Sequence, residues 1–293
     1  MRSTSEELAA DGAYRIENNH WKKGDAVYLP LYEGKMVQMY DHRAAEIEVH
    51  PENVHRPAQP RPATIAEHTD PHWLPEPQYW VPEKNVHADQ PWVIAFKDVT
   101  APTNERTMIA ALVPRAGFGN TLPLLLPGST APDYRRNAPL LLANLNSFAF
   151  DFLARQKVQG QHLNLYILEQ VPVIPPSKFE ERIGSRQIGD YVREQVLHLT
   201  YTAVDMEPFA RDLGHQGDPF RWDEVDRRHR RARLDALFFY LYGITRTEAD
   251  YVLNQFPIVR EDDETELGTF RTRDLVLAYF NALRAGDLET RVA

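Results

Sequence analysis

The densest group of side chains that could do chemistry lies in a polar stretch around Gly160. Guanidinium, ammonium, amide and imidazole groups follow one another there, on Arg155, Gln156, Lys157, Gln159, Gln161, His162 and Asn164. Such groups can hydrogen-bond base edges or phosphates. They include no nucleophile and no good set of metal ligands, so the stretch is typical of a surface that reads a polymer rather than one that transforms it.

A second polar cluster, residues 103–107, lies between two apolar stretches. Arg106 could contact guanine through two hydrogen bonds, and Asn104 could contact adenine in the same way. The alternative is ordinary turn chemistry, in which short polar side chains satisfy nearby backbone groups. That alternative is favoured for Thr103, whereas the residues leave the role of Arg106 open.

Basic residues are concentrated between Asp223 and Arg233, in the stretch DEVDRRHRRAR. On a helix they would spread over a broad face and could neutralise several phosphates, each adding to a salt-dependent affinity. The opposing interpretation is a solvated helix face that is partly paired with acidic residues one turn earlier. The candidate phosphate contacts are Arg227, Arg230 and Arg231, together with Lys97 and Arg115 earlier in the chain.

Metal chemistry has weaker support in the sequence. His68 and His72 are four residues apart, but the Asp-Pro pair between them disfavours the helix that such a zinc site needs. Asp25, Glu33 and Lys35 imitate the acid–acid–lysine pattern of restriction nucleases, yet the last two lie on an expected turn. We therefore expect no metal site in this chain.

The consecutive residues Asp41, His42 and Arg43 could imitate a catalytic trio. They follow a strand-like segment, so structural ion pairs at the end of a strand are the favoured interpretation. The chain also has no phosphate-binding glycine loop and no serine in a nucleophile elbow. The sequence therefore predicts no catalytic residue.

The composition limits these interpretations. The chain has 293 residues, a formal net charge of −9 and no cysteine, which excludes disulfides and thiolate metal sites. The negative charge argues against a globally basic nucleic-acid binder, so DNA contacts must depend on a local basic stripe. The chain starts without the apolar run of a signal peptide, and no apolar run could span a bilayer, which favours a cytoplasmic protein with no membrane partner.

The elements expected before residue 176 are mainly strands. Alternating apolar residues predict a strand from Ala26, a turn at Gly34 and a returning strand from Met36 to Tyr40. Residues 50–91 are too rich in proline for a long helix and should form an extended arm or a long ordered loop. Buried strands are predicted at 92–96, 107–113 and 122–126, and a helix at 139–155.

Helical patterns dominate after residue 176. Helices are predicted at 179–199, with an interruption near 184–189, and at 223–242, 246–256 and 272–285. Asp223 is the expected N-cap of the second of these, and Thr245 and Glu248 form a capping box for the third. The predicted fold is α+β, with a leader at 1–20, a domain with a mixed, mainly antiparallel sheet plus helices at 21–176, and an all-helical module at 177–293. The ragged start suggests a piece of a longer protein or an engineered chain.

Four stretches resemble a known family, and they occur in the family's order: residues 28–43, 92–114, 144–176 and 233–281. They are similar to the target-recognition region of adenine-methylating, single-chain restriction–modification enzymes, and more distantly to the specificity subunits of type I restriction systems. The resemblance implies a target-recognition domain followed by a helical tail, and binding to double-stranded DNA. The Asn/Asp-Pro-Pro-Tyr motif of the methylases is absent from this chain, as is their glycine-rich cofactor strand.

The expected function is therefore sequence-specific DNA recognition in a restriction–modification system, without catalysis by this chain. S-adenosylmethionine is expected on a separate methylase or nuclease part, which would flip the target adenine. Two alternatives stay open: a protein-interaction scaffold in an anti-phage system, built on residues 50–91, and a metal-dependent nuclease with a hidden site. The expected DNA contacts are Lys97, Asn104, Arg106, Arg115, Arg155, Lys157, Gln159, Gln161, His162, Asn164, Arg227, Arg230 and Arg231.

Overall fold

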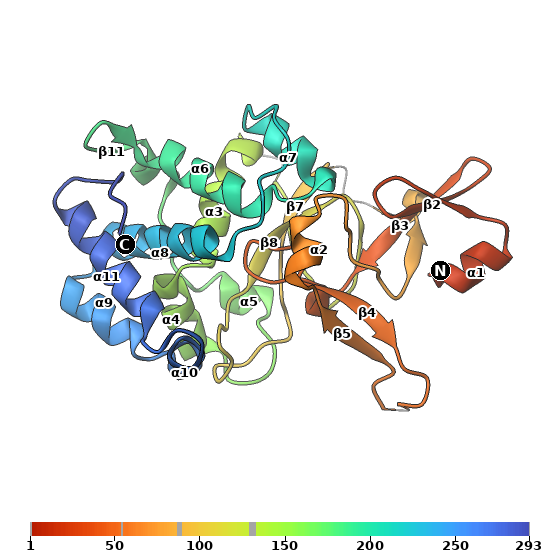
Figure 1. Ribbon diagram of the computed structural model, residues 1–293, viewed down its shortest axis with the longest axis horizontal. Helices are drawn as coiled ribbons and strands as arrows, with labels where there is room; N and C mark the ends of the chain where they lie inside the picture. Colours follow the sequence, from red (N-terminus) through yellow and green to blue (C-terminus); the bar gives the residue numbers. More distant parts are fainter. Residues whose placement is uncertain (1, 54, 87–89, 129–132, 293) are drawn as a thin grey trace. The chain divides into compact units, whose positions relative to one another are not determined.

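The computed structural model describes residues 2–53, 55–86, 90–128 and 133–292 (Figure 1). Contacts within the chain divide it into two compact units. Unit 1 contains Met1–Asp98, Ala110–Pro132 and Thr200–Trp222, and unit 2 contains Val99–Ile109, Asp133–Leu199 and Asp223–Ala293. Antiparallel sheets in the N-terminal part and helices in the C-terminal part confirm the predicted α+β class. The division differs from the expected boundary at residue 176, because each unit combines segments from both sides of that position.

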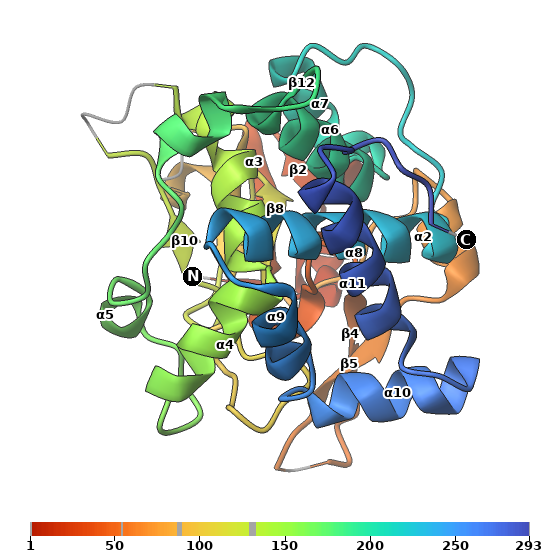
Figure 2. The ribbon, with the colours of Figure 1, turned by 90° about the vertical axis from the view of Figure 1, so that its left-hand side faces the viewer.

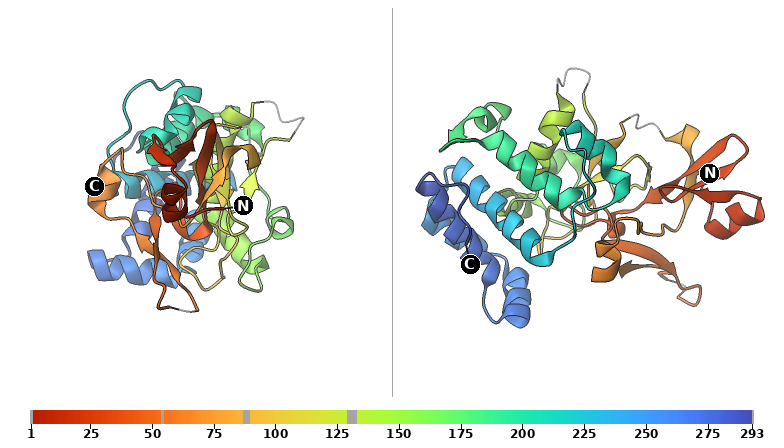
Figure 3. Two further views of the ribbon diagram at one scale, coloured as in Figure 1. Left: turned by 90° about the vertical axis from the view of Figure 1, so that its right-hand side faces the viewer. Right: turned by 45° about the horizontal axis from the view of Figure 1, so that its top comes forward.

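The first sheet of unit 1 begins near the N-terminus. Its antiparallel strands lie in the order β1 (Tyr14–Ile16), β2 (His20–Lys23), β3 (Ala26–Tyr32) and β6 (Trp80–Pro82), and β9 (Gly117–Phe118) pairs with β3 in parallel. Helix α1 (Ser5–Ala10), drawn in red near the N-terminus in Figure 3, starts with a capping box. Its Leu8 packs against Trp21 and Trp80. Residues 1–20 were expected to form a leader. In the structure α1 and β1 both belong to the folded unit, because this apolar cluster holds α1 and antiparallel pairing with β2 holds β1.

The second sheet of unit 1 has the order β10 (Leu124–Leu125), β7 (Trp92–Phe96) and β8 (Ala110–Pro114). Every residue of β7 is buried, as expected for a continuous apolar run, and the predicted strand at 92–96 is confirmed. The strands predicted at 107–113 and 122–126 also occur, with later and narrower bounds.

The predicted return strand from Met36 to Tyr40 is wrong. The short helix η1 (Gly34–Met36) takes its place, and Tyr40 has a φ of +59°, a left-handed conformation that a strand does not allow. Met36 and Val37 are both fully buried, so their side chains enter the core together rather than alternating between two faces.

The described proline-rich residues of unit 1 form no long helix, as predicted, but instead of the expected extended arm or long loop they form short strands and helices. They are β5 (Ala58–Pro62), which pairs with β4 (Ala45–Val49), then α2 (Ile65–Thr69), β6 and η2 (Glu83–Asn85). The helices η4 (Val204–Met206) and α7 (Glu207–Asp212) also belong to unit 1.

Unit 2 is helical apart from one small hairpin. Helix α8 (Glu224–Leu241) packs along α11 (Arg271–Arg284), and α4 (Phe148–Lys157) contacts both α8 and α9 (Arg246–Leu253) (Figure 2). The predicted N-cap at Asp223 and the Thr245–Glu248 capping box are confirmed. The other elements are α3 (Tyr134–Leu145), α5 (Leu165–Leu168), η3 (Pro176–Glu180), β11 (Arg182–Ile183), β12 (Arg186–Gln187), α6 (Ile188–Thr200) and α10 (Pro257–Leu267).

Two helix predictions in this unit need correction. The helix expected at 139–155 is two helices, because Ser147 ends the first and caps the second by accepting a hydrogen bond from the Phe150 amide. The helix expected at 179–199 starts only at Ile188, because Gly184, with a φ of +58°, turns the β11–β12 hairpin before it. Among the residues that the structure describes, no helix is long and apolar enough to cross a membrane.

Candidate nucleic-acid interface

Two polar segments that the sequence singled out lie side by side in unit 2. The Thr100 amide donates to the Gln161 carbonyl at 3.0 Å, and Val99 and His162 form an antiparallel bridge. Figure 2 shows the two segments below the end of α4, and we call residues 99–105 and 156–164 the paired loops. Their exposed polar side chains are Thr103, Asn104, Glu105, Gln156, Lys157, Gln159, Gln161, His162 and Asn164.

Apolar anchors explain why the second of the paired loops presents its polar side chains outward. Val158 is 3% exposed and Leu163 is fully buried, so the backbone is fixed in the core of unit 2 on both sides of residues 159–162. The residues between them, 159–162, are all exposed. This short span between buried anchors restricts the backbone, which lowers the entropy lost when its side chains bind a partner.

A buried ion network lies at the base of the paired loops. Asp151 is fully buried and accepts hydrogen bonds from Arg106 Nε at 2.7 Å and from Arg155 Nε at 3.3 Å. The Thr107 amide donates to both carboxylate oxygens of Asp151, at 3.2 and 3.1 Å. One carboxylate therefore joins α4 to the segment that carries the first loop.

The two arginines of this network also bind backbone carbonyls and aromatic rings. Arg106 donates to the Asn146 carbonyl and lies over the Phe148 ring at 4.0 Å. Arg155 lies 3.8 Å from the centre of the Phe256 ring and donates to the Glu105 carbonyl at 3.4 Å. Both were predicted to contact DNA. In the structure they are 3% and 9% exposed, so their guanidinium groups support the loops from inside and are not presented to a base.

A second buried carboxylate fixes the start of α4. Asp235 of α8 accepts a hydrogen bond from the Phe148 amide at 2.8 Å. Burial raises the pKa of Asp235 to about 6, although the nearby charge of Arg106 opposes that rise. Sequence reasoning missed Asp151 and Asp235. The signal that could have found them is an aspartate inside an otherwise apolar helical run, as in FAFDFLA and LDALFF. A buried aspartate needs a buried partner.

The basic cluster on α8 is largely occupied within unit 2. Arg227 is 4% exposed and donates to the Leu199 carbonyl at 2.5 Å. Arg230 pairs with Asp226 at 2.6 Å, one turn earlier, and donates to Gln195 Oε1 at 2.9 Å. Arg231 is half-buried. The pairing with earlier acidic residues that the sequence offered as the alternative is what the structure shows for Arg230. Arg227 and Arg230 are therefore engaged within unit 2 rather than presented to phosphates.

The two remaining predicted contacts belong to unit 1. Lys97 is half-buried directly after β7, and Arg115, directly after β8, forms an ion pair with Glu83. The structure therefore brings together the predicted contacts of the paired loops, whereas these two lie in a separately described unit.

The residues that imitated a catalytic trio form buried structural pairs, as the sequence favoured. His42 Nε2 lies 3.0 Å from both carboxylate oxygens of Asp205, and Asp41 Oδ2 lies 3.0 Å from His68 Nε2. Arg43 is fully buried and donates to four backbone carbonyls, those of His68, Asp70, Trp73 and Thr202.

The metal-nuclease alternative gains no support from the geometry. Lys35 pairs with Glu33 at 3.2 Å and donates to the Ala58 carbonyl at 3.1 Å, which gives it a structural role. Across the described residues, no group of three or more histidine, aspartate or glutamate side chains could hold a metal ion.

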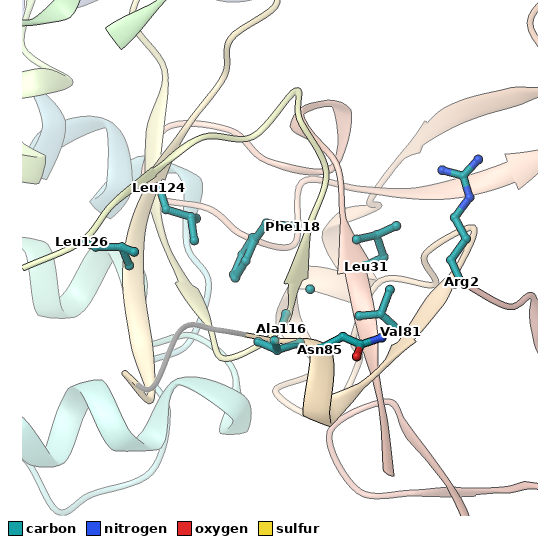
Figure 4. A pocket seen from close by; sticks show the side chains of 10 residues that line it. Arg2, Leu31, Val81, Asn85, Ala116, Phe118, Leu124 and Leu126 are labelled. Carbon is teal, nitrogen blue, oxygen red and sulfur yellow. The ribbon is translucent and has the colours of Figure 1, made fainter. Parts of the chain in front are cut away.

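Unit 1 also contains an apolar hollow of about 590 Å³ beside β3, β9 and β10. Leu31, Phe118 and Leu124 line it, and Figure 4 shows these side chains together with Arg2 and Asn85. Its lining is mostly aliphatic and aromatic, which suits an apolar partner better than a nucleic acid.

The polar surface of the paired loops, held from below by buried charges, is thus the candidate interface that geometry and sequence share. No protein-family model, no curated protein and no solved structure matches this chain.

Proposed function

We propose that this chain is a sequence-specific DNA-recognition module of a restriction–modification system, and that the paired loops read the bases. One observation carries the proposal: two polar loops, separate in sequence, are joined edge to edge and present exposed amide, imidazole and ammonium groups. These are the groups that discriminate base pairs in the major groove. The resemblance of four stretches to target-recognition regions supports the same function.

The buried network beneath the loops would give this recognition its precision. Asp151, Arg106 and Arg155 tie the loop ends to α4 and to backbone carbonyls. A contact surface fixed before binding loses less conformational entropy when it docks. The amides of Gln159, Gln161 and Asn104 would contact base edges, and Lys157 a phosphate.

The charge distribution shapes how the module would bind. The net charge is −9, and Arg227 and Arg230 are engaged within unit 2. Each neutralised phosphate contributes about −0.9 to the slope of log affinity against log salt. With Lys157 as the main loop cation, the chain alone should bind with a shallow salt slope of about −1 to −2. A catalytic part on another chain, which would carry S-adenosylmethionine, would supply further phosphate contacts.

Selection from a random duplex library at two salt concentrations tests this proposal. A recovered motif that Gln161→Ala changes would support base reading by the paired loops, and Lys157→Ala should weaken all sequences alike and flatten the salt slope. Gln216→Ala and Lys84→Ala are matched controls, because both side chains are exposed in unit 1. If the selection enriches no sequence motif, either for the chain alone or with a methylase part added, the proposal is refuted.

The apolar hollow favours a second candidate, the protein-interaction scaffold. A hollow of about 590 Å³ lined mainly by apolar side chains fits a protein partner. Under that function Leu124→Glu would abolish partner binding and leave duplex selection unchanged. A duplex motif that survives Leu124→Glu but not Gln161→Ala would favour the DNA-recognition function over the scaffold.

A further inference from the structure

A small cavity in unit 1 has walls of proline. It has a volume of about 200 Å³, and Leu74 and Tyr32 are among the residues that line it. Five proline rings, brought together from different parts of unit 1, form much of the wall: Pro30, Pro75, Pro91, Pro114 and Pro208. Proline has no backbone N–H, so these residues contribute apolar ring surface and no hydrogen-bond donor. Donors to anything in the proline-walled cavity must therefore come mainly from side chains.

One polar group of the cavity is the carboxylate of Asp205. Its side chain is 5% exposed, and both of its oxygens lie 3.0 Å from His42 Nε2. A carboxylate has about four acceptor positions, so Asp205 keeps acceptor capacity for a ligand. Since the His42 ring is itself 1% exposed, this carboxylate is fixed in place before anything binds.

Five further polar residues line the same space: Asn18, Asn19, His20, Tyr32 and Arg115. Burial is the main cause that lowers the pKa of His20, with the positive charge of Arg115 acting in the same direction and the negative charges of Glu83 and Asp205 opposing it. The neutral imidazole that results offers one donor and one acceptor. Burial, followed by the charge of Asp205, raises the pKa of Tyr32 well above its ordinary value, so its hydroxyl keeps its proton. Arg115 pairs with Glu83 and, with five N–H donors, can also donate to a ligand.

The surrounding buried network keeps the cavity from collapsing. Arg43 ties together the backbone around His68, Trp73 and Thr202 through its carbonyl contacts. The His68 ring stacks on Trp222 with centroids 3.8 Å apart and planes 9° from parallel. The cavity is therefore a preformed space with converging polar groups, which is the usual character of a small-molecule site.

We propose that the proline-walled cavity binds a planar heterocycle of the nucleobase class, with an amino group facing Asp205 and a ring or carbonyl acceptor facing Arg115. The apolar proline rings suit the face of a ring system, and the polar side chains suit its edge. The volume lies below the roughly 300 Å³ at which sites for drug-sized molecules begin, so one ring system is the appropriate size. The proposal does not depend on DNA recognition by the paired loops, which belong to unit 2.

Two sources could supply such a ring, a free base or nucleoside and an unstacked base in a nucleic-acid strand. Both present the same edge to Asp205 and Arg115. Their affinities would differ, because a strand also brings phosphates. Comparing adenosine with a short single-stranded oligoadenylate at equal base concentration separates them: tighter binding of the oligonucleotide identifies the strand.

The test is calorimetric titration of the full chain with adenine and with purine, which differ only in the amino group. Adenine should bind at least tenfold more tightly than purine, because only adenine has the amino group that would face Asp205. Cytosine and guanosine, which also carry an amino group, extend the test to the other bases. Leu74→Trp, which fills the cavity, should abolish binding, and His20→Ala should weaken it at least tenfold. His55→Ala is the control, because that histidine is exposed and lies outside the cavity.

Asp205→Asn tests the carboxylate directly and should remove the preference for adenine over purine. If the loss of the His42 pair unfolds this variant, Leu74→Trp and His20→Ala still decide the question. Failure of adenine, cytosine and guanosine to bind would overturn the proposal. Equal affinity for adenine and purine, or binding that Leu74→Trp leaves unchanged, would overturn it as well.

Discussion

Replacing the buried Asp151 by alanine should destabilise unit 2 more than any single substitution at the surface of unit 2 or in the paired loops. Asp151 is fully buried and neutralises two guanidinium groups, those of Arg106 and Arg155, which are 3% and 9% exposed. Its carboxylate also accepts from the Thr107 amide. The substitution would leave two buried positive charges and one backbone donor without their partner.

The magnitude follows from that count. Removing one partner of a buried ion pair costs about 3–5 kcal/mol, because the remaining charge stays desolvated. An unsatisfied buried amide costs about 1–3 kcal/mol more when no water reaches it. Since the stability of a domain is only about 5–15 kcal/mol, we expect Asp151→Ala to lower the free energy of unfolding by about 4 kcal/mol or more.

Urea titration with two probes measures this effect unit by unit. Far-UV circular dichroism reports mainly the helices, most of which lie in unit 2. Tryptophan fluorescence reports unit 1, because all five tryptophans lie there. The dichroism midpoint should fall strongly, and amide exchange at Thr100, which donates across the paired loops, should speed up. Asp226→Asn is the control, because it removes an exposed i,i+4 pair with Arg230 and should cost under about 0.5 kcal/mol. A loss below about 1 kcal/mol for Asp151→Ala would refute the claim that this carboxylate holds the network.

Three further outcomes are expected. Because burial raises the pKa of Asp235 from 3.8 to about 6, the folded chain binds this proton more readily than the unfolded chain, and stability falls as the pH rises through that window. Asp235→Asn should remove about 3 kcal/mol of this pH dependence. If urea titrations from pH 4 to 7.5 show the same change of unfolding free energy with pH in the variant, the assignment is contradicted. A fragment of residues 1–176 should fail to fold, since it lacks Asp205 and the rest of the segment that completes unit 1; a cooperative thermal transition in the fragment would count against the two-unit division. In duplex binding, Arg230→Ala should leave the salt slope unchanged, because Asp226 and Gln195 already bind that side chain. Lys157→Ala should reduce the magnitude of the salt slope by about 1. Equal slopes for the two variants would show that Lys157 does not contact a phosphate.

Local signals in the sequence identified the elements that local chemistry decides. The buried strand Trp92–Phe96, the N-cap at Asp223 and the Thr245–Glu248 capping box all depend on near neighbours, and all are present. The exposed polar run 156–164 was also visible, because its composition alone excludes a core position for most of it.

Features that depend on long-range packing were not predictable in this way. Met36 and Val37 lie next to each other in a segment that was expected to be a strand, but both are buried by partners far along the chain. Arg106 and Arg155 look like free cations until Asp151 is placed between them. A buried pair and an exposed contact use the same residue types, so only the fold distinguishes them.

Each unit is assembled from three separate stretches of chain, and the backbone passes between the units five times, after residues 98, 109, 132, 199 and 222. During synthesis, unit 1 therefore cannot be completed until Trp222 has left the ribosome, and unit 2 needs the last helices as well. Neither unit could be exchanged between related proteins by a single genetic crossover, since any single cut divides at least one of the two units. New binding specificity would have to arise by substitution of exposed side chains in the paired loops. Such substitutions leave the interleaved path of the backbone unchanged, and with it the buried network beneath the loops.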